Sequence, residues 1–126
     1  MINLTLNQSL IDEFNENGFL ILDQFIDLEW IDKLKSKFEP LFKGEFETGN
    51  EPDEWNLRFG KDAEDVTRQI CNGWKSDNLI KNLVCHHVVG ETCSRLMNWK
   101  GAKLIQDNVL WKPPGGKTLG YHQDAA

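Results

Sequence analysis

The sequence predicts an α+β fold, because two kinds of hydrophobic periodicity occupy different parts of the 126-residue chain. Up to Met97, apolar residues recur every three or four positions over long stretches, which is typical of helices that bury one face. From Ala102 the period changes to two, which is typical of a strand. Neither an internal repeat nor a linker interrupts the pattern, so we expect a single domain over residues 1–126.

The composition is that of a folded, acidic protein. Hydrophobic residues make up 40% of the chain, including 5 Trp and 7 Phe. The net charge of −6 would repel a phosphate backbone, which argues against nucleic acid as a partner. The longest apolar runs are far shorter than the roughly 20 residues of a membrane span, and a secretory signal is missing. Because 3 cysteines cannot all pair, we expect a cytoplasmic protein with reduced thiols.

The first part of the chain predicts two helices with a strand between them. Residues 7–15 have helical spacing, and Gly18 can end this helix. The apolar run 19–22 lies between turn-forming residues and predicts a short buried strand. Asp27 can cap a second helix, whose apolar stripe extends over 28–42.

The middle of the chain predicts an irregular region and then a third helix. Pro40 kinks or ends the second helix and Gly44 closes it. Residues 44–73 show no lasting period, so we expect an ordered but irregular excursion. Ser76 can cap a third helix, for which the apolar stripe predicts one long element over 76–98.

The last 25 residues carry the candidate chemistry. In the predicted strand 102–112, alternation places an amide, a second amide and an ammonium on one face, namely Gln106, Asn108 and Lys112, together with Leu110. The opposite face is apolar except for Asp107 and holds Ile105, Val109 and Trp111. Such a strand either lines a binding surface or exposes its polar residues to water.

A turn and a possible metal-binding pair follow this strand. Residues 113–116, Pro-Pro-Gly-Gly, force the chain to change direction. On the extended backbone that we expect after the turn, His122 and Asp124 point the same way. Iron(II) that activates oxygen takes nitrogen and oxygen ligands on one face and keeps other positions open. Taken alone, a His-x-Asp pattern is more often an ordinary polar contact than a metal site.

Three segments, 17–23, 106–116 and 121–124, occur in the order and with the residues of a known family. In them the chain resembles the phytanoyl-CoA dioxygenase family of iron(II)/2-oxoglutarate oxygenases. The resemblance implies the N-terminal part of a double-stranded β-helix, a jelly-roll or cupin-like fold with helices packed on the sheet. It also implies that His122 and Asp124 bind iron(II).

The resemblance further implies a reaction and a co-substrate site. The reaction is hydroxylation of a small organic substrate with iron(II), 2-oxoglutarate and O₂. Asn108 falls on a co-substrate position, Gln106 and Lys112 share its face, and Arg68 falls near an upstream basic position. Beyond the metal ligands, no catalytic residue is implied. Because halogenating relatives lack the metal-binding carboxylate, Asp124 favours oxygenation.

The chain also departs from the family pattern. The family has a second iron-binding His and a 2-oxoglutarate-anchoring Arg farther downstream, whereas this sequence stops at Ala126. We therefore expect the N-terminal part of a longer enzyme, inactive alone. The alternative is a non-catalytic binding or assembly module on a degenerate oxygenase scaffold. The prime substrate and the oligomeric state stay open.

A second metal-binding candidate is weaker. Cys85, His86, His87 and Cys93 could suggest zinc, but structural zinc sites usually pair cysteines at shorter spacing. Adjacent histidines within one helix would also point about 100° apart. We expect Cys71 and Cys93 to be small buried residues rather than nucleophiles.

Overall fold

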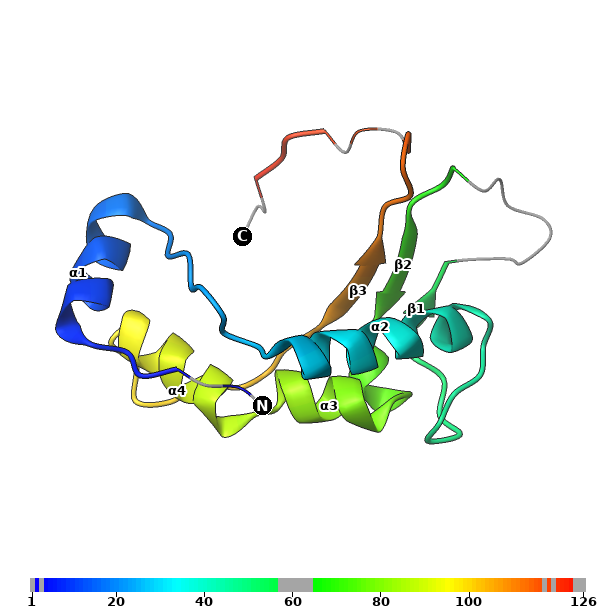
Figure 1. Ribbon diagram of the computed structural model, residues 1–126, viewed down its shortest axis with the longest axis horizontal. Coiled ribbons are helices and arrows are strands. Elements are labelled where there is room, and N and C mark those ends of the chain that lie inside the picture. The colour runs from blue at the N-terminus through cyan, green and yellow to red at the C-terminus, as the bar shows by residue number, and fades with distance from the viewer. Residues whose placement is uncertain (1, 3, 57–64, 117, 119, 124–126) are drawn as a thin grey trace.

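The computed structural model describes residues 2, 4–56, 65–116, 118 and 120–123. Helices and a small antiparallel sheet make up this part of the chain, with the strands in the order β1-β2-β3 (Figure 1). This confirms the α+β class. In chain order the elements are α1 (Gln8–Asn17), α2 (Leu28–Phe42), β1 (Glu54–Trp55), β2 (Arg68–Cys71), the 3₁₀ helix η1 (Gly73–Lys75), α3 (Asn78–Val84), α4 (His87–Leu96) and β3 (Asn108–Trp111).

The hydrophobic core lies between one face of the sheet and helices α2 and α3. Ile70 of β2 and Val109 of β3 are register partners and project from this face. They pack with apolar residues of the two helices, which are Leu34, Leu41, Phe42 and Ile80. Because side chains alternate along a strand, the neighbours of Ile70 and Val109 point to the other side of the sheet.

Helices α1 and α2 follow the sequence closely. The side chain of Asn7 caps α1, and Gly18 ends it with a left-handed φ of 75°. Asp27 caps α2 by accepting a hydrogen bond from the backbone N–H of Trp30 at 2.9 Å. Pro40 lies inside the last turn of α2 rather than ending it. Both helices are therefore confirmed, since local capping signals determine where they begin and end.

The prediction of a buried strand over 19–22 is wrong. This segment has no regular secondary structure, and the side chains of Phe19 and Ile21 are 59% and 75% exposed. A strand requires a partner for its backbone hydrogen bonds, and among the described residues none pairs with 19–22. An apolar run shows that a segment can be buried, but it does not show what would cover it.

The prediction of one long helix over 76–98 is also wrong, because a second capping side chain, His86, divides it into α3 and α4. Asp77, not Ser76, caps α3, and its Oδ1 accepts hydrogen bonds from two backbone N–H groups at 2.8 and 3.0 Å. His86 has an extended backbone and caps α4, with its Nδ1 accepting from the N–H of Val88 at 3.3 Å. A capping residue has a non-helical backbone, so α3 ends before His86.

Residues 44–73, expected to be irregular, contain β1 and the central strand β2. β2 spans four residues, Arg68–Cys71, and pairs with β1 and β3 on its two sides. A strand this short shows no period in the sequence, so long-range pairing rather than local pattern defines it. After α2, Gly44 has a φ of +82° and lies against the ring of Trp55, whose Nε1 donates to the carbonyl of Phe42 at 3.1 Å.

Strand β3 is shorter than the predicted strand 102–112. Ile105 precedes it and is 94% exposed, so the expectation that it faces the core is wrong. Val109 is buried, as expected. Asp107 is half-buried, because its Oδ1 accepts a hydrogen bond from the N–H of Trp74 at 3.1 Å and its backbone pairs with Asn72. None of the described helices is long and apolar enough to cross a membrane.

Candidate functional site

A polar face lies on the side of the sheet opposite the core. We define this polar face by four residues, which are Gln69 and Cys71 of β2 and Asn108 and Leu110 of β3. The register pairs Cys71 with Asn108 and Gln69 with Leu110, so these side chains project to the same side. Alternation thus separates this polar row from the apolar row of Ile70 and Val109.

Three polar side chains of this face and Gln106, which precedes β3, form one hydrogen-bonded group, which we call the amide-thiol cluster: Gln69, Cys71, Asn108 and Gln106. The Oδ1 atom of Asn108 accepts from Cys71 Sγ at 2.9 Å, from Gln69 Nε2 at 3.2 Å and from Gln106 Nε2 at 3.4 Å. Gln106 Nε2 also lies 3.2 Å from Cys71 Sγ, and Gln69 Nε2 lies 3.5 Å from it. Side chains from β2, from β3 and from the segment before β3 therefore meet at two atoms, Asn108 Oδ1 and Cys71 Sγ.

The thiol of Cys71 is the buried centre of this cluster. The residue is 5% exposed, and burial raises the pKa of its thiol above the usual value. The carboxylate of Glu54 on β1, with Oε2 3.5 Å from Sγ, raises the pKa further. Cys71 is therefore a protonated thiol at neutral pH and acts as a hydrogen-bond donor rather than as a nucleophile.

The surroundings of Asn108 define how its amide is oriented. Because Oδ1 accepts all three donors, Nδ2 points away from them, and within the described part of the chain Nδ2 makes no hydrogen bond. Asn108 is exposed, so its N–H₂ group is accessible from the polar face. Amide N–H groups bind carboxylates and other anionic oxygens. The polar face thus offers an N–H donor to a carboxylate or another anionic oxygen.

The predicted co-substrate residues separate into two groups. The structure brings Gln106 and Asn108 into contact through the cluster, and the exposed Lys112 directly follows β3. Arg68 is the register partner of Trp111 and lies 5.6 Å above its ring, on the side of the sheet opposite Asn108. Arg68 therefore lies apart from Gln106 and Asn108, because its position in β2 differs by one residue from Gln69.

The predicted metal ligands follow the turn after β3. The turn is confirmed, since the N–H of Gly116 donates to the carbonyl of Pro113 at 3.0 Å. From there the C-terminal segment turns back from the end of β3 (Figure 1). The exposed His122 donates through Nδ1 to the carbonyl of Gly120 at 3.2 Å, whereas Asp124 lies outside the described residues.

A hydrogen bond from Nδ1 to a carbonyl fixes the tautomer in which Nε2 is the coordinating atom of the imidazole. His122 therefore suits a metal ligand in its donor chemistry. Among the residues that the structure describes, which exclude Asp124, no group of three or more His, Cys, Asp or Glu side chains could hold a metal ion.

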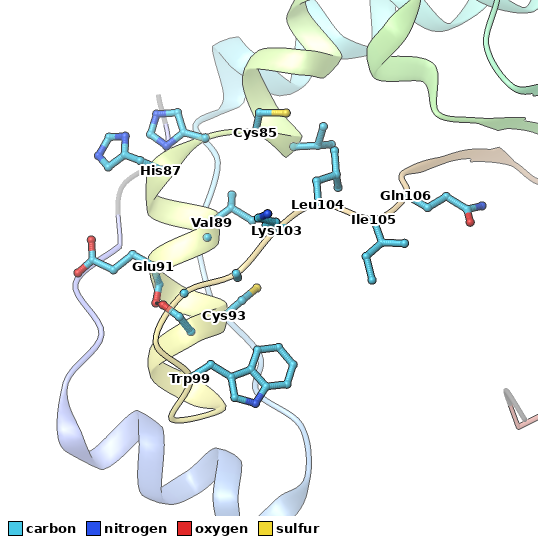
Figure 2. Close-up of a pocket in the computed structure, with 16 residues that line it drawn as sticks. Cys85, His87, Val89, Glu91, Cys93, Trp99, Lys103, Leu104, Ile105 and Gln106 are labelled. Carbon is cyan, nitrogen blue, oxygen red and sulfur yellow. Dashed lines mark hydrogen bonds between the residues drawn. The ribbon is translucent and has the colours of Figure 1, made fainter. Parts of the chain in front are cut away.

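A second surface, the weaker zinc candidate, lies along α4. A groove of about 840 Å³ separates this helix from residues 99–106. Figure 2 shows His87 pointing away from the 99–106 segment and Cys93 pointing toward it. The side chains of Cys85 and Cys93 are exposed, so the expected burial of Cys93 is wrong. His86 and His87 stack with ring centroids 4.6 Å apart, because the helix begins between them.

Sequence reasoning missed two residues of the cluster. The sequence indicates no role for Gln69. It predicts that Cys71 is a small buried residue, which is confirmed, but it does not predict the hydrogen bond of Cys71 with Asn108. The signal that could have found them is the alternation of Arg68–Cys71, which puts Gln69 and Cys71 on one side. Four residues are too few for that pattern to be recognised without the partner strand.

Known proteins resemble this chain over most of its length. The model of the phytanoyl-CoA dioxygenase family matches residues 14–126. A 2-aminoethylphosphonate dioxygenase from the uncultured bacterium HF130_AEPn_1 is 27% identical over 116 residues, which cover 90% of this chain and 42% of that protein. The chain thus spans less than half the length of this curated relative. No solved structure matches the chain. Because the family match covers nearly all of the chain, including both strands of the polar face, the chain belongs to the phytanoyl-CoA dioxygenase family.

Proposed function

We propose that the protein acts as a non-haem iron(II)- and 2-oxoglutarate-dependent dioxygenase that hydroxylates a small organic substrate. Membership of the family and the related dioxygenase support an oxygenase. The observation that carries the co-substrate assignment is the amide-thiol cluster, which directs the amide of Asn108 to an accessible face of the sheet. Because the chain covers less than half of its relative, this activity is proposed for the protein as a whole.

In this proposal the polar face binds the co-substrate. The N–H₂ group of Asn108 donates to a carboxylate of 2-oxoglutarate, and Gln106 holds the neighbouring position in the cluster. Lys112 supplies a positive charge at the end of the same strand. Arg68 stays a prediction from the resemblance and is not included, because it lies on the other side of the sheet.

His122 and Asp124 would hold the iron, with the Nε2 atom of His122 as its nitrogen ligand. An imidazole and a carboxylate are the ligand types that iron(II) takes in enzymes of this class. When bound, iron supplies the oxidation of the substrate by O₂, coupled to the conversion of 2-oxoglutarate to succinate and CO₂. The hydrogen bond from His122 Nδ1 to the carbonyl of Gly120 would orient the imidazole and increase its basicity.

Calorimetry tests this proposal without requiring turnover. We expect 2-oxoglutarate to bind the purified protein in the presence of Mn(II), used as a redox-inactive substitute for iron(II), and much less tightly in its absence. His122→Ala should remove the metal dependence. The control His87→Ala changes an exposed histidine of α4 and should leave binding unchanged.

Asn108→Ala tests the co-substrate site separately. A hydrogen bond to a charged group contributes on the order of 1.5–3 kcal/mol, so we expect affinity for 2-oxoglutarate to fall about tenfold or more. The control Asn82→Ala, at an exposed position of α3, should have no effect. Unchanged binding in both His122→Ala and Asn108→Ala would contradict the proposal and favour a non-catalytic module.

The related dioxygenase suggests a first substrate to test. We propose 2-aminoethylphosphonate, or another small organic acid of this kind, as a candidate. Succinate formation from 2-oxoglutarate by the iron(II)-loaded protein as a whole should rise when a true substrate is added. A panel in which amino acids or acyl thioesters, rather than aminophosphonates, raise succinate formation would reject this candidate and keep the reaction class.

A further inference from the structure

The sulfur of Cys71 lies between donors on one side and acceptors on the other. Gln106 Nε2 and Gln69 Nε2 approach it at 3.2 and 3.5 Å, and both can only donate. Asn108 Oδ1 and Glu54 Oε2 lie at 2.9 and 3.5 Å, and both can only accept. A thiol has one proton to give, and the shorter distance assigns it to Asn108.

This proton matters because an asparagine amide can take two orientations that differ by a half-turn. If Asn108 were turned, its Nδ2 would bring a third N–H to the sulfur, and Oδ1 would lose the donor at 2.9 Å. The S–H group would then have the more distant carboxylate of Glu54 as its acceptor. The thiol therefore favours the observed orientation of the amide, together with the Gln69 and Gln106 N–H groups that also donate to Oδ1.

The orientation decides what the polar face can bind. In the observed orientation Nδ2 is the accessible atom, and the face offers N–H donors to an anion. In the turned orientation a carbonyl oxygen would be accessible and would repel a carboxylate. The side chain of Cys71 is 5% exposed, so it influences a ligand through Asn108 rather than by contact.

We propose that Cys71 is a positioning residue whose S–H group holds the Asn108 amide with Nδ2 directed outward to receive a carboxylate of the co-substrate. This inference rests on the proposed function in its choice of 2-oxoglutarate as the ligand. The thiol itself takes no part in the chemistry, and burial raises its pKa further above neutral pH, so it keeps its proton.

A set of variants measured by calorimetry with 2-oxoglutarate and Mn(II) tests the inference. Cys71→Ala removes the donor, and we expect affinity to fall about two- to tenfold, the effect of one hydrogen bond. Cys71→Ser retains a donor and should restore affinity to within about twofold of the starting protein. In the Asn108→Ala background, Cys71→Ala should cause no further loss, because the two residues act through one interaction.

Three results would overturn the inference: unchanged affinity in Cys71→Ala, equal losses in Cys71→Ser and Cys71→Ala, or the same loss from Cys71→Ala with and without Asn108. The same loss from Cys71→Ala in the Asn108→Ala background would show that Cys71 acts on the structure in general and not through Asn108. Denaturant midpoints of all variants identify any that fail to fold; if Cys71→Ala is among them, Cys71→Val, which fills a similar volume without a donor, takes its place in each comparison.

A second readout separates this inference from the proposed function. The side-chain ¹⁵N–H₂ signals of Asn108, recorded without any ligand, should shift in Cys71→Ala and return in Cys71→Ser. If these signals behave as expected while Asn108→Ala leaves 2-oxoglutarate binding unchanged, the positioning role holds and the co-substrate assignment fails. Signals identical in all three proteins would reject the positioning role directly.

Discussion

Two isoleucines with opposite surroundings allow the clearest test of this fold. Ile70 is 0% exposed and lies between the sheet and the two covering helices, whereas Ile105 is 94% exposed. Replacing a buried isoleucine by alanine removes three carbon atoms, each contributing about 0.8 kcal/mol on transfer from water. This gives about 2.4 kcal/mol, and the cavity left in the core adds to it, so we expect Ile70→Ala to lower the free energy of unfolding by about 3–4 kcal/mol.

Ile105→Ala makes the same chemical change at the exposed position and should alter stability by less than about 0.5 kcal/mol. Urea unfolding followed by tryptophan fluorescence measures both changes. Midpoints are compared only if the dependence of the unfolding free energy on urea concentration is the same in all variants. A loss below about 1 kcal/mol in Ile70→Ala, or comparable losses in the two variants, would refute the assignment of the core to this face of the sheet.

Four further predictions concern two glycine positions and two titrating carboxylates. Gly44→Ala should destabilise the protein by more than about 1 kcal/mol, because φ is +82° and an added Cβ would lie 2.5 Å from the ring of Trp55. Gly90→Ala lies in open space within α4 and should stabilise the protein by up to about 1 kcal/mol. Thermal unfolding measures both effects. Burial raises the pKa of Asp107, so its ionised form weakens the folded state, and any gain in stability from Asp107→Asn should be larger at pH 7 than at pH 4. The hydrogen bond with Lys75 lowers the pKa of Asp53 below 3.8, so the stabilisation from this pair is present near pH 7 and is lost as pH falls through that lowered pKa; a stability difference between wild type and Asp53→Asn that stays constant from pH 7 to pH 2 would contradict this.

The parts of this fold that the sequence predicts are those determined within a few residues. Asn7 and Gly18 set the ends of α1, and Asp27 sets the start of α2, because a cap and its helix are adjacent in the chain. The division between α3 and α4 was missed although its signal is equally local. His86 is an unusual cap, and the apolar stripe continues across it.

The remaining errors involve contacts between distant parts of the chain. β2 exists because β1 and β3 pair with it, and 19–22 is no strand because the described chain provides no partner. At the candidate site, alternation correctly placed Gln106 and Asn108 together, but the contribution of Gln69 and Cys71 depends on a register that pairs residues 37 positions apart in the chain. Local patterns carry no information about that register.

The strict alternation of β2 has a consequence for how this protein can change over time. Ile70 packs in the core, while its neighbours Gln69 and Cys71 make hydrogen bonds in the amide-thiol cluster. Core packing and formation of the candidate site therefore depend on different side chains of one short strand. New ligand preferences can therefore arise by substitution of Gln69 without repacking the interior. An insertion of a single residue in this strand would exchange the two rows and abolish core packing and the candidate site at once.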